Sequence, residues 1–490
     1  MPRTSLTATT LAVVDLGSNS FRLEIGRVEG DQVFRLDTWR ETLRLGAGID
    51  ERGYLRPEAC RAALDCLARF AERLAGLHPS AVRAVATNTL RVARNSATFL
   101  PQAERALGFP IDIITGHEEA RLIYLGAAHM LPASDEPRLV IDIGGGSTEF
   151  IIGRGLEPLR LESLKMGCVG MTQRYFRDGK LGAAAFTAAE TFARAEVEAI
   201  ARDFSHRHWT AAYASSGTAL ALAEILEQNG FSEGGITPAG LARLKARMIA
   251  AGHVRKLSLE ALKPERAPVL AGGLAVMAAA AAELDAERID PVGGALRLGV
   301  LYDLLGRRIH RDIRVATVDQ FQTRWRIDRE HASRVAGVAA ELLTAALPDA
   351  NPDEQQHLAW SALLHETGFT VSHTGFHKHG AYIVQNADMP GFSAGDQQTL
   401  ALLVLGCRGS LEKMKAMLGN RRFLAQLLAL RLAVLLHHAR QPIDHPRTRF
   451  ALGPPVTFSM PEQWLRAHPL TAFLLDKERA EWRAAGLRVH

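Results

Sequence analysis

VVDLGSNSFRLEIG (residues 13–26) and VIDIGGGSTEFIIG (residues 140–153) are two copies of one pattern, and this pattern decides how the chain folds. Each copy starts as an apolar, β-branched strand, reaches an aspartate (Asp15 or Asp142), and continues through a turn of small residues into a second strand. The alternative is two unrelated hairpins with glycine turns. Because the aspartate stands at the same place in both copies, we expect two similar lobes that face each other.

The rest of the first 300 residues alternates short apolar runs with helical patterns, which is typical of an α/β fold. The runs that we expect to form buried strands span residues 11–15, 81–87, 139–143 and 211–215. Beyond residue 305 the pattern becomes helical. We therefore predict α/β lobes at 1–130 and 131–305, an all-α domain at 306–445 and a small appendage at 446–490.

The composition is that of an ordinary soluble protein. The 490 residues are 47% hydrophobic and 23% charged, with a net charge of +5, which excludes wholesale disorder and collagen-like repeats. Four cysteines form no CxxC pair, so we expect a reducing, cytoplasmic setting and no disulfide scaffold. Of the two most apolar stretches, 271–284 is too short to span a bilayer and 423–437 contains Arg431. We expect no membrane span and no DNA partner.

The turns of the two repeated hairpins are candidate phosphate sites. Glycine lets the backbone approach an anion, and successive N–H groups can then form an anion-binding concavity. Residues 144–148 (GGGST) supply one such turn, and residues 17–20 (GSNS) supply another with added side-chain donors. Asp142, with Glu149 seven residues further across the turn, is a candidate pair for Mg²⁺, which prefers a few carboxylates together with substrate phosphates.

A carboxylate and an arginine are further candidates. Glu118 and Glu119 stand in the first turn of a predicted helix, where acidic residues are favoured by the helix dipole alone. Adjacent helical residues point about 100° apart, so we expect one of the two to face a ligand. Such a carboxylate would act as a base toward water. Arg91, after a predicted strand end, is either a phosphate clamp or a surface arginine.

Two other turns and a group of histidines could form binding sites or could have only structural roles. SSGT (215–218) and the paired glycines at 293–294 each lead into a helix, as anion sites or as plain connections. His365 and Glu366 adjoin in a helix, with His331 at the start of another, which suggests a metal site of the HD type. The pair is His-Glu and not His-Asp, so packed histidines of a helical bundle are the alternative.

Several of these motifs together resemble one known family. The segments DLGSNSFRL, ATNTLR, GHEEARLIYLG, VIDIGGGSTEF, SLKMGCVGMTQRYF and SSGT occur in this order, and a glycine pair follows them at 293–294. The combination is similar to the exopolyphosphatase and guanosine pentaphosphate phosphatase (Ppx/GppA) family. The later segment ALLHETGFTVSHTGFHKHGAYIVQNADMPGF resembles the helical C-terminal domain of its long members, so the resemblance covers nearly the whole chain.

The resemblance implies an actin-like fold, in which two ribonuclease H-like lobes are followed by an all-α HD-like domain. It implies hydrolysis of terminal phosphoanhydrides with Mg²⁺, with Glu119 as the base that activates water and Asp142 and Glu149 at the metal. It also implies a homodimer and a helical domain that is a degenerate HD copy. The residues that it assigns to the phosphates are Ser18, Asn19, Ser20, Arg91, Gly145, Gly146 and Ser147.

The substrate that we expect is inorganic polyphosphate, cleaved from its end to release orthophosphate. The alternative within the family is the 5′-phosphate of guanosine pentaphosphate (pppGpp). A small-molecule kinase of the same fold and a non-catalytic polyphosphate or alarmone sensor are alternatives from other classes. A long polyanion would need a basic channel. The residues that could line it are the arginines at 307–329 and Lys413, Lys415, Arg421 and Arg422. The alternative is that these residues lie on solvated helix faces.

Overall fold

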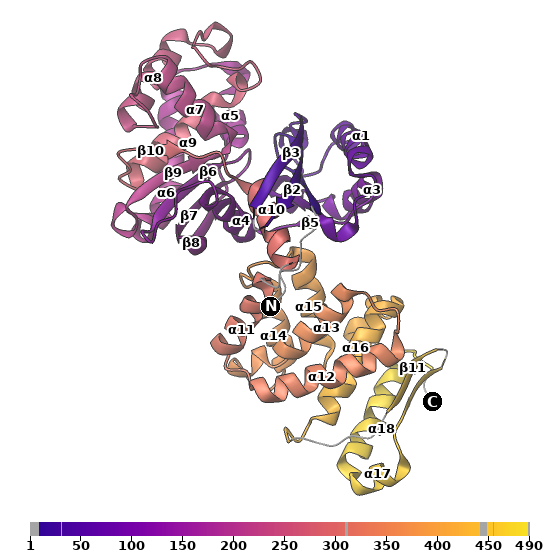
Figure 1. Cartoon of the computed structure of the whole chain (residues 1–490). Helices are drawn as coiled ribbons and strands as arrows, with labels where there is room; N and C mark the ends of the chain where they lie inside the picture. Colours follow the sequence, from indigo (N-terminus) through magenta and orange to yellow (C-terminus); the bar gives the residue numbers. More distant parts are fainter. Residues whose placement is uncertain (1–8, 31, 309–311, 442–447, 454, 489–490) are drawn as a thin grey trace. The chain divides into compact units, whose positions relative to one another are not determined.

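The computed structural model describes residues 9–30, 32–308, 312–441, 448–453 and 455–488, and these residues form two compact units (Figure 1). The first unit ends at Asp312 and the second begins at Ile313. The first holds two five-stranded sheets with their helices, and the second is mainly helical. The predicted boundary at 445/446 lies outside the described residues, and the predicted division of the first unit after residue 130 stays a prediction.

The two sheets of the first unit repeat one topology. The first has the order β3-β2-β1-β4-β5 and the second has the order β8-β7-β6-β9-β10. In both, the first three strands in sequence are antiparallel neighbours and the last two add in parallel. The strands are β1 (Thr9–Leu16), β2 (Phe21–Glu29), β3 (Gln32–Glu41), β4 (Val82–Ala86), β5 (Ile111–Ile113), β6 (Arg138–Ile143), β7 (Thr148–Arg154), β8 (Glu157–Leu164), β9 (Ala211–Ser215) and β10 (Ile289–Pro291).

The repeated sequence pattern forms the hairpins β1–β2 and β6–β7, as predicted. The register places Asp15 opposite Arg22 in the first hairpin and Asp142 opposite Glu149 in the second. Both second strands carry an irregularity at the equivalent Ile-Gly step, between Ile25 and Gly26 and between Ile152 and Gly153. The two hairpins therefore resemble each other in sequence and also in the position of this register shift.

Helices cover the faces of both sheets, and two of them pair with each other. The helices are α1 (Pro57–Leu74), α2 (Asn88–Val92), α3 (Ser96–Leu107), α4 (Gly116–Ala128), α5 (Cys168–Tyr175), α6 (Ala183–Phe204), α7 (Ser216–Gln228), α8 (Pro238–Ala251), α9 (Leu270–Glu283) and α10 (Leu296–Arg308). Helix α4, which follows the first sheet in sequence, packs on β7 and β8 of the second, and α10, which follows the second sheet, packs on β1 of the first.

Glycines allow α4 and α10 to cross at close range. A Cβ at Gly299 of α10 would lie 1.7 Å from the carbonyl oxygen of Leu122, and one at Gly126 of α4 would lie 2.2 Å from that of Ala295. Backbone therefore packs directly on backbone where the two helices meet. Because each helix also lies on one of the sheets, this crossing holds the two lobes together.

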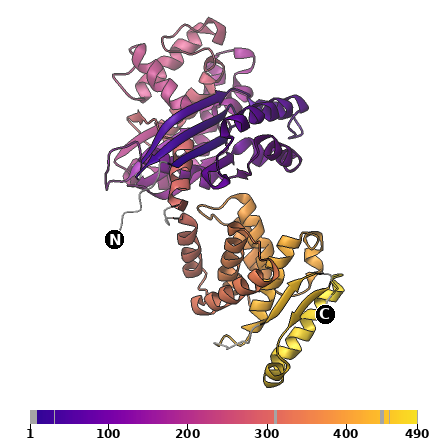
Figure 2. The same ribbon diagram turned by 45° about the vertical axis from the view of Figure 1, so that its right-hand side comes forward.

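The second unit is an all-α domain with a short hairpin, which confirms the predicted fold class (Figure 2). Its helices are α11 (Ile313–Arg324), α12 (Arg329–Ala346), α13 (Pro352–Leu364), α14 (Phe376–Asn386), α15 (Ala394–Gly406), α16 (Arg421–Leu436), α17 (Glu462–Ala467) and α18 (Pro469–Ala484). Strands β11 (Arg449–Leu452) and β12 (Val456–Ser459) form the hairpin. Phe450 and Phe458 of this hairpin share one core with Trp482 of α18.

The four cysteines are free thiols, of which Cys66, Cys168 and Cys407 are buried. Among the described residues, no helix combines the length and the apolar character that crossing a membrane requires.

We predict that Gly299→Ala lowers the free energy of unfolding of the first unit by about 1–3 kcal/mol, because the added methyl group overpacks the helix crossing. Urea unfolding followed by circular dichroism measures the change. Gly170→Ala is the matched control, since Gly170 is exposed in α5 and a Cβ there would meet no atom within 4 Å. A loss at Gly170 as large as that at Gly299 would contradict the prediction.

Candidate active site

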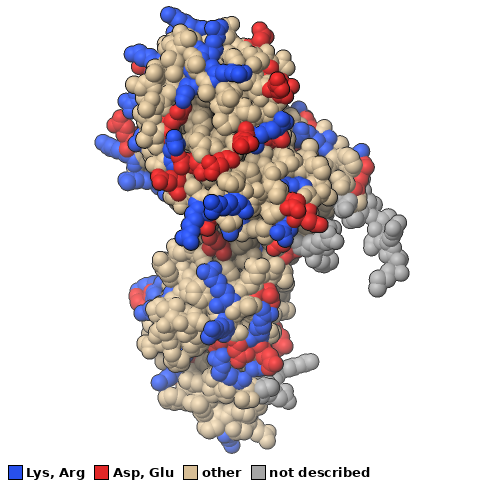
Figure 3. Space-filling view, turned by 90° about the vertical axis from the view of Figure 1, so that its left-hand side faces the viewer, with Lys and Arg blue, Asp and Glu red and all other residues tan. Residues whose placement is uncertain are grey.

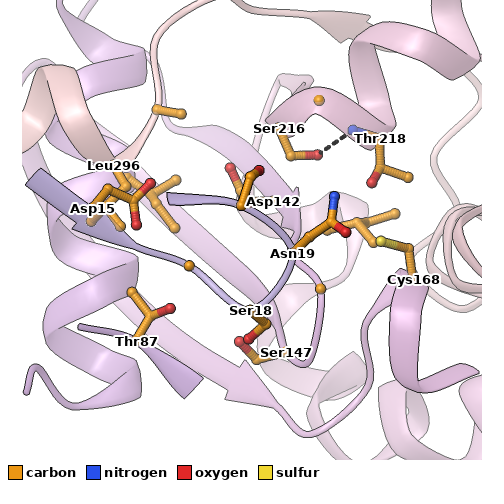
Figure 4. A pocket seen from close by; sticks show the side chains of 18 of the residues that line it. Asp15, Ser18, Asn19, Thr87, Asp142, Ser147, Cys168, Ser216, Thr218 and Leu296 are labelled. Carbon is orange, nitrogen blue, oxygen red and sulfur yellow. Dashed lines mark hydrogen bonds between the residues drawn. The ribbon is translucent and has the colours of Figure 1, made fainter. Parts of the chain in front are cut away.

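The turns of the two repeated hairpins meet at a cavity of about 200 Å³ in the first unit (Figure 4). A Cβ at Gly145 would lie 3.0 Å from the Cβ of Ser18 and 3.5 Å from the backbone nitrogen of Asn19, so the turns are in contact. Figure 4 shows Ser18 and Ser147 side by side, with Asp15 and Asp142 at the ends of their strands on the same side of the turns. The sequence repeat is therefore brought together in space, as the prediction of facing lobes requires.

Six of the seven residues predicted to hold phosphate line this cavity. They are Ser18, Asn19, Ser20, Gly145, Gly146 and Ser147. Glycines also permit close contacts at this turn and at Gly167, just before α5. A Cβ at Gly146 would lie 2.0 Å from Nδ2 of Asn88, and one at Gly167 would lie 2.5 Å from the backbone of Gly145. A side chain at Gly167 would therefore press on the backbone of the turn.

Arg91, the seventh predicted phosphate ligand, has a different place. It does not line the cavity; its Nη1 donates to Oε2 of Glu119 at 2.7 Å and to the carbonyl oxygen of Ile114 at 2.9 Å. Arg91 thus hydrogen-bonds a carboxylate of the same site, and its predicted role at the phosphates stays a prediction.

Glu119 lines the cavity from the first turn of α4. The helix begins there because Thr115 caps it, its hydroxyl accepting a hydrogen bond from the backbone nitrogen of Glu118. Burial raises the pKa of the Glu119 carboxyl to about 7, against the opposing effect of Arg91, and the nearby carboxylates of Asp15 and Asp142 raise it further. A carboxyl that titrates near neutral pH suits a base that takes a proton from water.

Glu118, the neighbour of Glu119, faces away from the cavity into a buried ion-pair network. Arg121 binds it through two hydrogen bonds of 2.7 and 2.8 Å, and the same arginine binds Asp303 at 2.6 Å. Arg83 joins the network by donating to Asp303 at 2.7 Å. The structure thus separates the two glutamates as the helical angle predicts: Glu119 faces the cavity and Glu118 supports the packing of α4 on α10.

The predicted metal pair is also buried at this site. Asp142 lines the cavity and accepts a hydrogen bond from the hydroxyl of Ser215, while Glu149 lies opposite it on β7 and accepts one from Ser163 at 2.9 Å. Burial raises the pKa of Asp142 to about 6, and burial together with Glu119 and Asp142 raises that of Glu149 well above its ordinary value. A cation bound beside these carboxyl groups would favour their ionised form.

The donor set fits a magnesium ion that also binds substrate. Oδ1 of Asp15 is buried and has no hydrogen-bond partner among the described residues, so the site offers an unused oxygen ligand beside Asp142. Mg²⁺ takes one or two carboxylates and completes its shell with water and substrate phosphates, so Asp15 and Asp142 would be enough to hold it.

Three arginines that the sequence reasoning missed line the cavity. They are Arg22, Arg266 and Arg297. Nη1 of Arg297 lies 3.8 Å from Oδ2 of Asp15. Burial and the neighbouring Arg297 lower the pKa of Arg22 to about 10, so it stays positively charged at neutral pH. The signal that could have found Arg22 is the hairpin register, which places it directly opposite Asp15.

The SSGT turn, left open by the sequence, belongs to the same cavity. Ser216, Gly217 and Thr218 line it, and Ser216 is held at φ 82, a left-handed conformation that a non-glycine residue adopts at a cost. The hydroxyl of Ser216 accepts hydrogen bonds from the backbone of Thr218 (Figure 4) and of Ala219, each at 3.2 Å. A Cβ at Gly217 would lie 1.8 Å from Nη2 of Arg266, so this glycine makes room for the guanidinium group.

Two sheets of actin-like topology around a cavity of glycine turns, arginines and buried carboxylates define a protein that acts on phosphate groups. The sequence matches the Ppx/GppA phosphatase family over residues 27–308 and domain III of that family over residues 313–479. The chain belongs to the Ppx/GppA phosphatase family. It is 38% identical over 474 residues, 95% of each chain, to the guanosine-5′-triphosphate,3′-diphosphate pyrophosphatase of Vibrio parahaemolyticus.

Solved structures show the same fold. The chain resembles an exopolyphosphatase from Cytophaga hutchinsonii with a TM-score of 0.55 and 24% identity, over 61% of this chain and 98% of that one. It resembles a Ppx/GppA family member from Aquifex aeolicus with a TM-score of 0.52 and 22% identity, over 62% of this chain and 99% of that one. At these identities the likeness establishes the actin-like architecture, and the substrate is a separate question.

We predict that Glu119→Gln lowers kcat for phosphate release by roughly 10²–10⁴-fold, because an amide cannot take a proton from water. Glu118→Gln is the matched control, one residue away on the same helix turn. It should retain kcat and instead lower stability, since Arg121 loses a charged partner. Phosphate release and thermal unfolding of both variants test the pair. Equal activity of Glu119→Gln and the wild type would refute the role of Glu119.

We predict that Asp142→Asn stabilises the metal-free protein increasingly as pH rises from about 4 to above 6. The raised pKa means that the folded state binds the Asp142 proton more tightly than the unfolded state, so ionisation above pH 6 destabilises the wild type by on the order of 3 kcal/mol. Urea unfolding with EDTA at several pH values measures the difference. Asp203→Asn, on an exposed side chain, should show no such trend, and a flat difference for Asp142→Asn would rule the prediction out.

Proposed function

We propose that this protein hydrolyses the terminal phosphoanhydride at the 5′ end of guanosine pentaphosphate and releases orthophosphate. The observation that carries the proposal is the 38% identity to a guanosine-5′-triphosphate,3′-diphosphate pyrophosphatase, which extends over 95% of both chains. The motifs of the sequence alone favour polyphosphate, with pppGpp as the alternative. The whole-chain likeness, helical unit included, favours the second of these two substrates.

The residues of the cavity support this chemistry. The two glycine turns and the arginines of the cavity bind the terminal phosphate, and phosphoryl transfer depends mainly on such positioning and charge neutralisation. Glu119 orients a water molecule and accepts its proton while the water oxygen bonds to the terminal phosphorus. The bond from that phosphorus to the bridging oxygen breaks, and the leaving diphosphate end carries the electron pair away. Arg91 fixes the Glu119 carboxylate through its 2.7 Å hydrogen bond.

Asp142 and Glu149, together with the unpartnered Oδ1 of Asp15, are the residues that would hold Mg²⁺. When bound, the ion supplies positive charge that offsets the charge of the phosphate oxygens. It would also relieve the repulsion among the buried carboxyl groups, which raises the pKa of Glu119 and Glu149.

The size of the cavity supports a substrate that inserts only its phosphate end. About 200 Å³ is less than the roughly 300–1,000 Å³ of pockets that enclose a drug-sized ligand. A nucleoside would therefore stay outside the described cavity. The kinase alternative would need room for a nucleoside. Gly294 offers none, because a Cβ there would lie 2.0 Å from the carbonyl oxygen of Gly126, whereas a Cβ at Gly293 would meet no atom within 4 Å.

Inorganic polyphosphate is the second candidate because its terminal phosphoanhydride fits the same residues. The basic channel that a long polyphosphate chain would need has less support than the cavity itself. Among the described residues, several of the proposed cations are ion-paired: Arg307 with Asp303, Arg329 with Asp319, Lys415 with Glu412 and Arg422 with Glu354. Arg311 lies outside the described residues. Figure 3 shows a face on which Lys and Arg are interspersed with Asp and Glu.

We predict that phosphate release with Mg²⁺ is faster, in kcat/KM, from pppGpp than from long-chain polyphosphate at matched concentrations of chain ends. A colorimetric phosphate assay of the purified full chain measures both. Faster release from polyphosphate would return the assignment to exopolyphosphatase. Tight binding of pppGpp without phosphate release would favour the sensor, and phosphate transfer that depends on a small acceptor would favour the kinase.

A further inference from the structure

A second group of chemically active side chains lies in the helical unit. It consists of His331 in the first turn of α12 with His365 and Glu366 directly after α13. Nε2 of His331 lies 3.6 Å from Oε1 of Glu366, and Nε2 of His365 lies 3.8 Å from the same oxygen. One ligand atom from each residue lies within 4.8 Å of the others, and all three residues are buried.

The hydrogen bonds of these residues leave their ligand atoms available. Nδ1 of His365 lies 2.7 Å from the carbonyl oxygen of Ala362, which can only accept, so Nδ1 carries the proton and Nε2 keeps its lone pair. This is how metal-binding histidines are usually oriented. His331 is 3% exposed, and its Nδ1 has no hydrogen-bond partner among the described residues. When Nδ1 of His331 carries the ring proton, the lone pair lies on Nε2, the nitrogen that faces Glu366 at 3.6 Å.

We infer that His331, His365 and Glu366 form a binding site for a first-row transition-metal ion, with Zn²⁺ as the ion that best suits two imidazoles and one carboxylate. Nitrogen and oxygen ligands around tetrahedral Zn²⁺ lie roughly 3.3 Å apart, so the observed spacing needs only a small contraction. All three residues line a cavity of about 470 Å³ in the helical unit. The cavity leaves room for water or another ligand at the remaining position of the ion.

Arg440 binds Glu366 at the position where a metal ion would bind. Its guanidinium group binds both oxygens of Glu366, at 2.7 and 2.8 Å, although the arginine side chain is 44% exposed. A half-exposed arginine can move to a single oxygen at little cost, which would free Oε1 for a metal ion while Oε2 keeps a hydrogen bond. The arginine therefore competes with the metal, and the strength of that competition is measurable.

The alternative is a structural arrangement in which Arg440 and Glu366 form an ion pair beside two packed histidines. The two interpretations predict opposite effects of Arg440→Ala. In the structural arrangement, removal of Arg440 leaves a buried carboxylate unpaired and creates no metal site. In the metal site, the same change removes a competing positive charge and strengthens binding.

The test is titration of the purified full chain with Zn²⁺ alone as the probe, by calorimetry, in excess Mg²⁺ to saturate the carboxylates of the first unit. We expect one zinc ion in this site, and His365→Ala and Glu366→Gln should each weaken its binding by more than about 100-fold. His373→Ala is the matched control, because His373 lines the same cavity outside the three-residue group, and it should leave zinc affinity unchanged. Co²⁺ in place of Zn²⁺ should give a visible absorption band that the first two variants lose.

Arg440→Ala should tighten zinc binding about tenfold or more, and this variant retains all three ligands if the others fold poorly. Equal zinc affinity in the wild type and His365→Ala would overturn the proposal. So would an unchanged or weakened affinity in Arg440→Ala. Phosphate release plays no part in these measurements, so their outcome is independent of the proposed function.

Discussion

Contact between two glycine-containing hairpin turns is the constraint on which the rest of the first unit depends. The backbone at Gly145 lies close to Ser18 and Asn19, where a Cβ would be 3.0 and 3.5 Å from them, and the backbone at Gly146 lies close to the side-chain amide of Asn88. This approach directs the carboxylates at the ends of β1 and β6, and the donors of both turns, into one cavity. The crossing of α4 and α10, backbone against backbone, maintains that approach from behind the sheets.

The site created in this way carries an electrostatic cost. Asp142, Glu119 and Glu149 are all buried, and burial is the largest cause of the raised pKa of each. Arg91 offsets part of this cost at Glu119. The protein thus keeps several anionic groups in a low-dielectric site where only a cation or a positively charged partner stabilises them, and such an arrangement is characteristic of a functional site and not of a structural core.

The sequence predicts features that depend on neighbouring residues, and it does not predict contacts between residues that are distant in the chain. The strands 139–143 and 211–215, the two hairpins and the change to a helical pattern after residue 305 are local features, and all of them are found in the structure. The contrast between Glu118 and Glu119 was also predictable from the helical angle. The hydrogen bond from Arg91 to Glu119 could not be predicted from the sequence, because the two residues are brought together by tertiary packing.

The sequence by itself determined the repeated strand–turn–strand unit, the actin-like class and most of the residues that surround the cavity, because periodicity and turn chemistry act over a few residues. Only the tertiary structure decided that Arg266 and Arg297 join Arg22 in lining the cavity, since they come from distant segments. It also decided that α4 and α10 each lie on the sheet of the other lobe. Long-range packing brings such groups together, and packing depends on the shape of the whole unit and leaves no local pattern in the chain.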